Sequence, residues 1–169
     1  MRLSRKWWFG AVPTLILGTA LLAGPADATL STAKSTVLAQ SVVKPTTIFS
    51  HGTTATGHGW LTLLATYGLT DGYVVDNKFD PGQSTGWHSH PGPSIVFVVA
   101  GTITNYTTDQ PHCAGVSYGA GSSFVDQGGT DVHILVNNGT VAAETIAVQF
   151  IPSGQTRRID EPEPAGCHL

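Results

Sequence analysis

Two histidines stand at a spacing that can place both rings beside one metal ion. His88 and His90 are two residues apart in the predicted strand 85–90, and residues i and i+2 of a strand point to the same face of a sheet. His133 lies in a second predicted strand, over 132–136. Neutral imidazole binds Fe, Zn, Mn, Ni and Cu, so the His-x-His pair is a candidate for part of a divalent metal site, although the pair alone is weak evidence. The alternative is a metal-free protein whose histidines are hydrogen-bonded internally.

The segments that carry and surround these histidines are predicted to be strands. Short β-branched or aromatic runs alternate with Gly, Pro, Asp and Asn, and no helical period persists for even 12 residues. This pattern is typical of an all-β sandwich or barrel. The predicted strands cover 46–49, 60–66, 73–79, 85–90, 95–100, 102–107, 123–126, 132–136 and 142–151.

The residues around the histidines resemble the two motifs of the cupin superfamily, and more narrowly small exported cupins of actinobacteria. The first motif runs from a glycine through a His-x-His pair to an acidic residue and a second glycine, and the second motif ends in a histidine followed by an asparagine. The matching positions are Gly82, His88, His90, Ser94 and Gly101, then His133 and Asn137. The resemblance covers about residues 46–152, which we predict to be the cupin domain.

The resemblance implies a double-stranded β-helix, or jelly-roll barrel, that holds one divalent transition metal. His88, His90 and His133 would be the ligands, while Ser94 replaces the family's glutamate. Because a serine hydroxyl binds a divalent ion poorly, we expect a three-histidine metal site. Without a carboxylate, the charge of the ion would favour hydroxide or an anionic group of a substrate.

The expected function is that of a metalloenzyme of the dioxygenase, lyase or isomerase type, acting on a small anionic organic molecule. The alternative is a non-catalytic cupin that binds a small ligand or only a metal. We find no side chain in the sequence that can be assigned as a general base, so no catalytic residue is predicted. Gln149 and Tyr106 are candidates for side chains that support the metal ligands, since both lie on predicted strands.

The first 28 residues are predicted to be a signal peptide. Arg2, Arg5 and Lys6 form a basic region, an apolar stretch follows, and the segment 26–28 (Ala-Asp-Ala) fits a signal peptidase site. The alternative is a retained membrane anchor, which the glycines and proline of the stretch disfavour. We therefore expect a secreted or extracytoplasmic protein, with residues 29–45 as a flexible lead-in.

Two cysteines, Cys113 and Cys167, lie in Pro- and Gly-rich segments. Export and the even number of cysteines predict a disulfide between them, which would tie the Pro-rich C-terminal tail, 153–169, back to the domain. The alternative is that Cys113 acts as a nucleophile or a metal ligand beside His112.

The charge balance of the chain is mildly acidic. It has 8 Lys and Arg against 11 Asp and Glu, and removal of residues 1–28 leaves 5 against 10. Nucleic acids and anionic membranes bind dense basic patches, so we expect no nucleic-acid partner and no stable membrane anchor after cleavage. The resemblance is also compatible with a homodimer, because dimerisation is common among cupins.

Overall fold

The computed structural model describes residues 27–167 and Leu169. Apart from Asp27 and Ala28, the predicted signal peptide lies outside the described residues and stays a prediction. Within the described part of the chain, no helix is long and apolar enough to cross a membrane.

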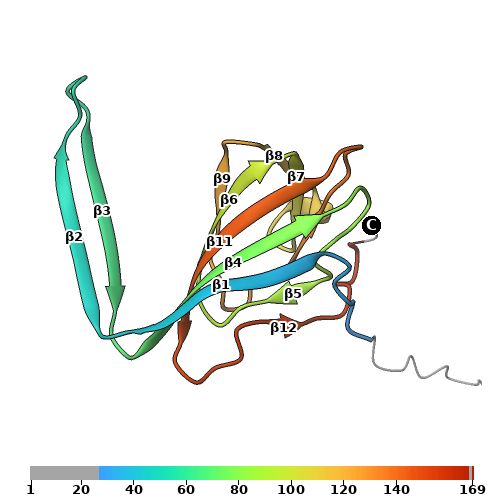
Figure 1. The fold of residues 1–169 in the computed structure, drawn as a ribbon, viewed down its shortest axis with the longest axis horizontal. Coiled ribbons are helices and arrows are strands. Elements are labelled where there is room, and N and C mark those ends of the chain that lie inside the picture. Colours follow the sequence, from blue (N-terminus) through green and yellow to red (C-terminus); the bar gives the residue numbers. More distant parts are fainter. Residues whose placement is uncertain (1–26, 168) are drawn as a thin grey trace, which may run out of the picture.

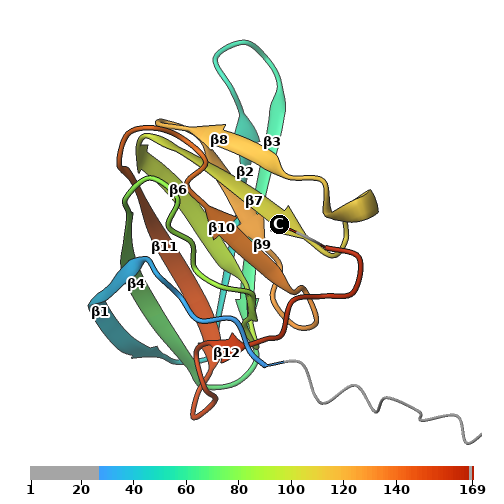
Figure 2. The same ribbon diagram turned by 90° about the vertical axis from the view of Figure 1, so that its right-hand side faces the viewer.

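Two five-stranded antiparallel sheets face each other and form a barrel (Figures 1 and 2). The all-β jelly-roll fold expected from the sequence is confirmed. The first sheet has the order β1 (Lys34–Val43), β4 (Thr70–Phe79), β11 (Ala143–Pro152), β6 (Ser94–Ala100) and β9 (Ser123–Asp126). The second has the order β12 (Ile159–Asp160), β5 (His88–Ser89), β10 (His133–Val136), β7 (Thr102–Thr107) and β8 (Val116–Gly119).

Alternation of side chains along the strands divides the barrel interior into an apolar and a polar end. Every second residue of β11 is buried, starting with Ala143, and β6 alternates in the same way from Ser94. The register places Ala147 opposite Val96 and Gln149 opposite Ser94. The apolar core therefore fills one end of the barrel, and polar side chains line the other end, where a ligand can be bound.

The segment expected to be a flexible lead-in, 29–45, is mostly a strand. β1 pairs with β4 in an antiparallel ladder from Lys34 opposite Lys78 to Val43 opposite Thr70, so the expectation is wrong for 34–43. β1 is an edge strand and most of its side chains are exposed. Its pairing depends on backbone hydrogen bonds more than on burial, and an exposed strand carries little hydrophobic pattern in the sequence.

The next segment forms a hairpin that stands clear of the barrel (Figure 1). It consists of β2 (Thr46–Thr53) and β3 (Gly59–Thr66), which pair only with each other. We call residues 46–66 the arm. The first two strands predicted for the cupin domain therefore lie outside the barrel, and β1 takes part in it instead.

The C-terminal tail returns across the second sheet and ends at a disulfide. β12 pairs with β5, with Asp160 opposite His88. Cys113, at the end of the short 3-10 helix Pro111–Cys113, is bonded to Cys167, with a Cα–Cα distance of 5.3 Å, so the predicted disulfide is confirmed. Both cysteines pack in a cluster with Trp87 and Ile134.

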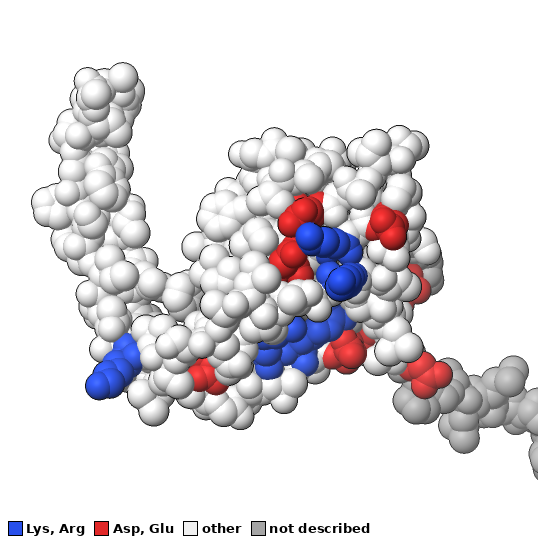
Figure 3. All heavy atoms as spheres, viewed as in Figure 1, with Lys and Arg blue, Asp and Glu red and all other residues white. Residues whose placement is uncertain are grey.

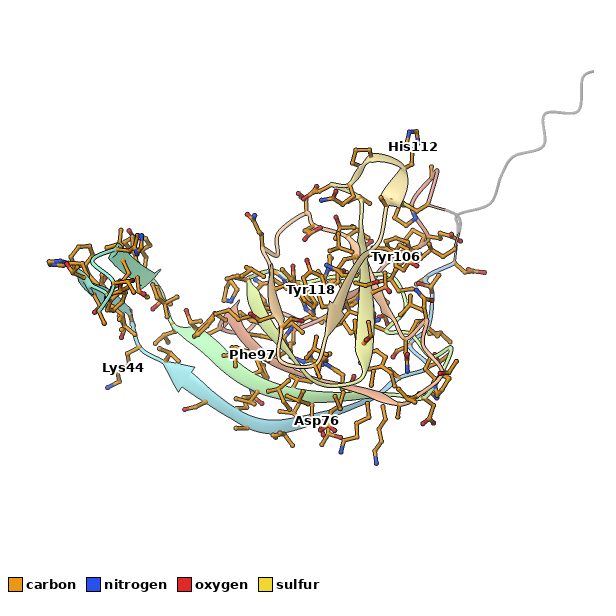
Figure 4. The ribbon with its side chains drawn as sticks, turned by 90° about the horizontal axis from the view of Figure 1, so that it is seen from above. Lys44, Asp76, Phe97, Tyr106, His112 and Tyr118 are labelled. Carbon is orange, nitrogen blue, oxygen red and sulfur yellow. A yellow bond between two sulfur atoms is a disulfide. The ribbon has the colours of Figure 1, made fainter. Side chains whose placement is uncertain are left out.

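The alternative role for Cys113, as a nucleophile or a metal ligand beside His112, is wrong because its sulfur is in the disulfide. His112 projects from the end of the molecule opposite the arm (Figure 4).

Replacing both Cys113 and Cys167 by Ser should lower the free energy of unfolding by about 2–4 kcal/mol, because the bond closes a loop with a sequence separation of 54 residues. Urea denaturation of the variant and the oxidised wild type measures this difference. Two thiols that titrate in the denatured, non-reduced wild type would contradict the disulfide.

Candidate metal centre

The structure brings the three sequence-predicted histidines together inside the polar end of the barrel. His88 lies on β5 directly opposite His133 on β10, and His90 follows β5 with its ring on the same side. Their candidate ligand nitrogens lie within 4.8 Å of one another. All three side chains are buried, with exposed fractions of 3–4%. The pairing of two short strands therefore sets the spacing of the cluster.

Backbone carbonyls orient two of the rings. Nδ1 of His88 lies 2.9 Å from the Gly86 carbonyl, and Nδ1 of His90 lies 2.7 Å from the Arg157 carbonyl. A carbonyl can only accept a hydrogen bond, so each Nδ1 carries the proton and each Nε2 keeps a free lone pair. This arrangement is the one that metal-binding histidines use to fix their tautomer.

The carbonyl that orients His88 depends on a glycine. Gly86 has φ = 68°, and a Cβ at this position would collide with the backbone carbonyl oxygen of Thr29. Any other residue would be strained here.

Burial keeps the three rings neutral. Removal from water lowers the pKa of His88 well below its ordinary value, and the neighbouring His133 lowers it further. Burial likewise lowers the pKa of His90. It lowers the pKa of His133 to about 4, although the Asp126 carboxylate opposes the shift. Neutral imidazole is the form that binds metal ions.

The histidines line a small cavity of about 40 Å³, which is space for a few water molecules. Two arginines from the C-terminal tail, Arg157 and Arg158, also line it. Arg158 forms a salt bridge with Asp160, at 2.7 Å, whereas Arg157 forms none among the described residues. Arg157 is therefore the positive charge at the cavity that no acidic side chain neutralises.

Comparison with known proteins identifies the family of this barrel. Residues 77–149 match the family model of the cupin domain. The part of the barrel that carries the three histidines is therefore a cupin domain. A comparison with curated proteins finds no match.

Several solved structures are similar in fold. A cupin superfamily protein from Desulfitobacterium hafniense is 13% identical over 74% of this chain and 83% of that chain, with a TM-score of 0.46. A predicted oxalate decarboxylase from Thermotoga maritima is 22% identical over 50% and 82%, with a TM-score of 0.40. An oxalate oxidase is 19% identical over 48% and 46%, with a TM-score of 0.42. At these levels the likeness concerns the fold alone.

Ser94 stands where the cupin motif has its glutamate, and it faces the cavity with an exposed fraction of 1%. Its hydroxyl accepts a hydrogen bond from Gln149 Nε2 at 3.0 Å, and the same amide nitrogen lies 3.4 Å from Nε2 of His90. Arg157 donates to Gln149 Oε1 at 2.9 Å, which fixes the orientation of the amide. Gln149 therefore lies beside the histidines, as expected from the sequence.

Tyr106 does not reach the histidines. Its hydroxyl accepts a hydrogen bond from Asn138 at 2.8 Å, its ring packs against the cluster around Trp87, and it does not line the cavity. The expectation that Tyr106 supports the metal ligands is wrong, because its side chain lies on the other side of the second sheet. Figure 4 shows Tyr106 on β7.

Sequence reasoning missed Asp126 and the two tail arginines. The signal for Asp126 is in the segment Ser123–Asp126, where burial alternates so that Phe124 and Asp126 both point inward. An acidic residue on the face shared with a buried phenylalanine is unusual. No comparable signal marks Arg157, since its place at the cavity follows from the return of the tail.

The metal-free protein should lose stability as the pH falls from 7.5 to 5. Unfolded histidines take up protons below about pH 6.5, whereas the buried rings do so only at lower pH, near 4 for His133; the unfolded state therefore binds more protons in this window and becomes favoured. In the presence of a chelator, the melting temperature should fall by several degrees.

Protonation of Asp131 changes the stability of the folded state in the opposite direction. Burial and the Asp126 and Asp109 carboxylates raise its pKa to about 6, so protonation of the folded state at this residue adds stability as the pH falls towards 4. Asp131→Asn should therefore steepen the loss of melting temperature. A melting temperature that does not change between pH 7.5 and 5 in this variant would contradict the neutral, buried histidines.

Proposed function

We propose that His88, His90 and His133 hold one divalent transition metal, Fe, Zn, Mn, Ni or Cu, and that the chain is a metal-dependent cupin that acts on a small anionic molecule. The observation that carries the proposal is the pair of Nδ1 hydrogen bonds to carbonyls, which leaves Nε2 of His88 and His90 unprotonated at a buried cavity. Three neutral nitrogens within 4.8 Å of one another fit the donor set of these ions.

Unpartnered polar atoms support the fit. His133 Nδ1 and Asp126 Oδ2 are buried and have no hydrogen-bond partner, which is costly unless a further group binds there. When bound, the metal would supply a Lewis acid or a redox centre. The protein would hold the three rings neutral and exclude bulk water from the cavity.

Arg157 favours an anionic substrate, and the size of the cavity favours a small one. Arg157 has no acidic partner among the described residues and is hydrogen-bonded to Gln149, whose amide N–H groups face Ser94 and His90. A carboxylate entering here would meet a guanidinium and an amide donor. The cavity of about 40 Å³ limits the bound part of the substrate to a few heavy atoms.

The alternative is a cupin that binds such a ligand without turnover. Oxygen uptake or product formation, measured on the metal-loaded protein with small carboxylates and thiols, separates the two. Saturable ligand binding without either signal would favour the alternative.

We place the mature protein outside the cytoplasm. The confirmed disulfide is typical of oxidising compartments, and the predicted signal peptide agrees with it.

Reconstituted protein should contain one metal ion per chain, and His133→Ala should lose more than nine-tenths of it because only two ring ligands remain. His112→Ala is the matched control: His112 is an exposed histidine of the short 3-10 helix, away from the cavity, so this variant should keep the full metal content. Elemental analysis after gel filtration measures both. Equal metal content in the wild type and His133→Ala would refute the three-histidine site.

A second copy of the chain is the macromolecular partner that we propose. The arm contains no Asp, Glu, Lys or Arg, and the space-filling view shows no charged atoms along it (Figure 3). Its apolar side chains are exposed, with exposed fractions of 61% for Phe49 and 63% for Leu61 and Leu63. A two-stranded hairpin is marginally stable alone, and apolar patches of this kind mark interfaces.

The barrel carries an exposed apolar surface that could receive the arm. Ile95 and Phe97 of β6 and Val125 of β9 are 40%, 43% and 63% exposed, and Ile95 lies directly opposite Val125. Because the arm stands clear of its own barrel (Figure 1), it leaves this surface uncovered. Two copies, each providing one arm and one such surface, would form a closed symmetric dimer.

The wild type should therefore be a dimer at micromolar concentration, and Leu61→Glu should make it monomeric while it stays folded. Val141→Glu is the control, since Val141 is 65% exposed in a loop outside both surfaces. Light scattering after gel filtration gives the masses. A monomeric wild type, or a dimeric Leu61→Glu, would contradict the arm-mediated dimer, as would binding of the arm to lipid vesicles in place of a second copy.

A further inference from the structure

Asp126 lies directly across the β-ladder from Ser94. β6 and β9 pair in antiparallel register with Ser94 opposite Asp126, and residues opposite each other in a ladder point to the same face of the sheet. The side chain of Asp126 therefore enters the same cavity, where its exposed fraction is 2%. The barrel has no carboxylate at Ser94 on β6, but it has one directly opposite, at Asp126 on the adjacent strand β9.

The carboxylate of Asp126 is only half satisfied by the protein. Its Oδ1 accepts a hydrogen bond from the Gly128 backbone N–H at 2.8 Å. Its Oδ2 has no hydrogen-bond partner and lies 3.7 Å from Nε2 of His90, while Oδ1 lies 3.9 Å from Nδ1 of His133. Among the described residues, neither lysine nor arginine forms a salt bridge with Asp126.

These distances fit ligands of one ion. Bonds from such ions to nitrogen and oxygen are about 2.0–2.2 Å long, so two ligand atoms of the same ion lie at most about 4.4 Å apart. The 3.7 Å between Asp126 Oδ2 and His90 Nε2 falls within this limit. A buried carboxylate oxygen without a partner is costly, and a cation at the histidines would remove that cost.

We propose that Asp126 provides the carboxylate ligand of the metal centre, from β9 in place of β6. This inference rests on the proposed metal site. The centre would then have three neutral nitrogens and one carboxylate, and a divalent ion would keep a net charge of about +1 rather than +2. The three-histidine ligand set expected from the sequence would be incomplete, because the carboxylate that is absent at Ser94 would be supplied by Asp126 on the opposite strand.

Co²⁺ binding to the full-length protein and to Asp126→Asn tests the proposal. Asparagine keeps the size of the side chain and the acceptor for Gly128, while it removes the charge and replaces the second carboxylate oxygen by an NH2 group that cannot bind a metal ion. The Co²⁺ dissociation constant should rise more than about tenfold, as expected for loss of a ligand or of its close support. Asp80→Asn is the matched control: Asp80 is exposed and outside the cavity lining, so its dissociation constant should stay within about threefold.

Thermal stability in the presence of a chelator distinguishes a ligand from a structural residue. If Asp126 is a metal ligand, its charge is uncompensated in the metal-free protein. Asp126→Asn then removes this buried charge, and the metal-free variant should melt at the same temperature as the wild type or higher. If Asp126 instead stabilises the fold, the metal-free variant should melt lower or fail to fold, and the proposal is overturned.

A transfer variant completes the test. Ser94→Glu combined with Asp126→Ser moves the carboxylate across the ladder to the position of the cupin motif, and it should recover most of the Co²⁺ affinity that Asp126→Asn loses. If the wild type and Asp126→Asn bind Co²⁺ equally well, Asp126 is not a ligand and the metal site itself stands. If the wild type binds no Co²⁺, the metal site fails and the role of Asp126 fails with it.

Discussion

The site depends on the hydrogen bonds from the histidine Nδ1 atoms to backbone carbonyls. A buried neutral imidazole must place its one N–H on one side of the ring, and the carbonyls of Gly86 and Arg157 decide that side for His88 and His90. The Gly86 carbonyl is two residues from its histidine and depends on a left-handed glycine. The Arg157 carbonyl is 67 residues from His90, so the barrel alone does not complete the orientation of the rings.

This constraint explains why the C-terminal tail is built into the second sheet. β12 pairs with β5 next to His88, Ser89 donates to Glu161 at 2.8 Å, and Cys167 fixes the end of the tail to Cys113. The tail thus supplies the second carbonyl and places Arg157 at the cavity. The disulfide lies outside the cavity, yet it restrains the segment on which the ring orientation depends.

Much of the site could be predicted from the sequence because its signals are local. His-x-His on a strand places both rings on one face. The short β-branched runs, separated by Gly, Pro, Asp and Asn, predict the barrel. The arginines and the β1 strand could not be predicted, since both depend on contacts distant in sequence. Asp126 is intermediate: its inward direction follows from alternation with Phe124, but its place opposite Ser94 requires the register of two strands.

Two of the strands that carry and cover the histidines, β5 and β12, are the shortest of the barrel. β5 and β12 contain two residues each and β10 contains four, and backbone hydrogen bonds from the segment before β5, such as Thr85 N–H to the Leu135 carbonyl, extend the contact with β10. A ligand that binds only the folded state stabilises it. An ion shared by His88 and His133 would join β5 to β10 at the one register pair between them, so metal binding would add a side-chain cross-link to the backbone hydrogen bonds that hold these strands together.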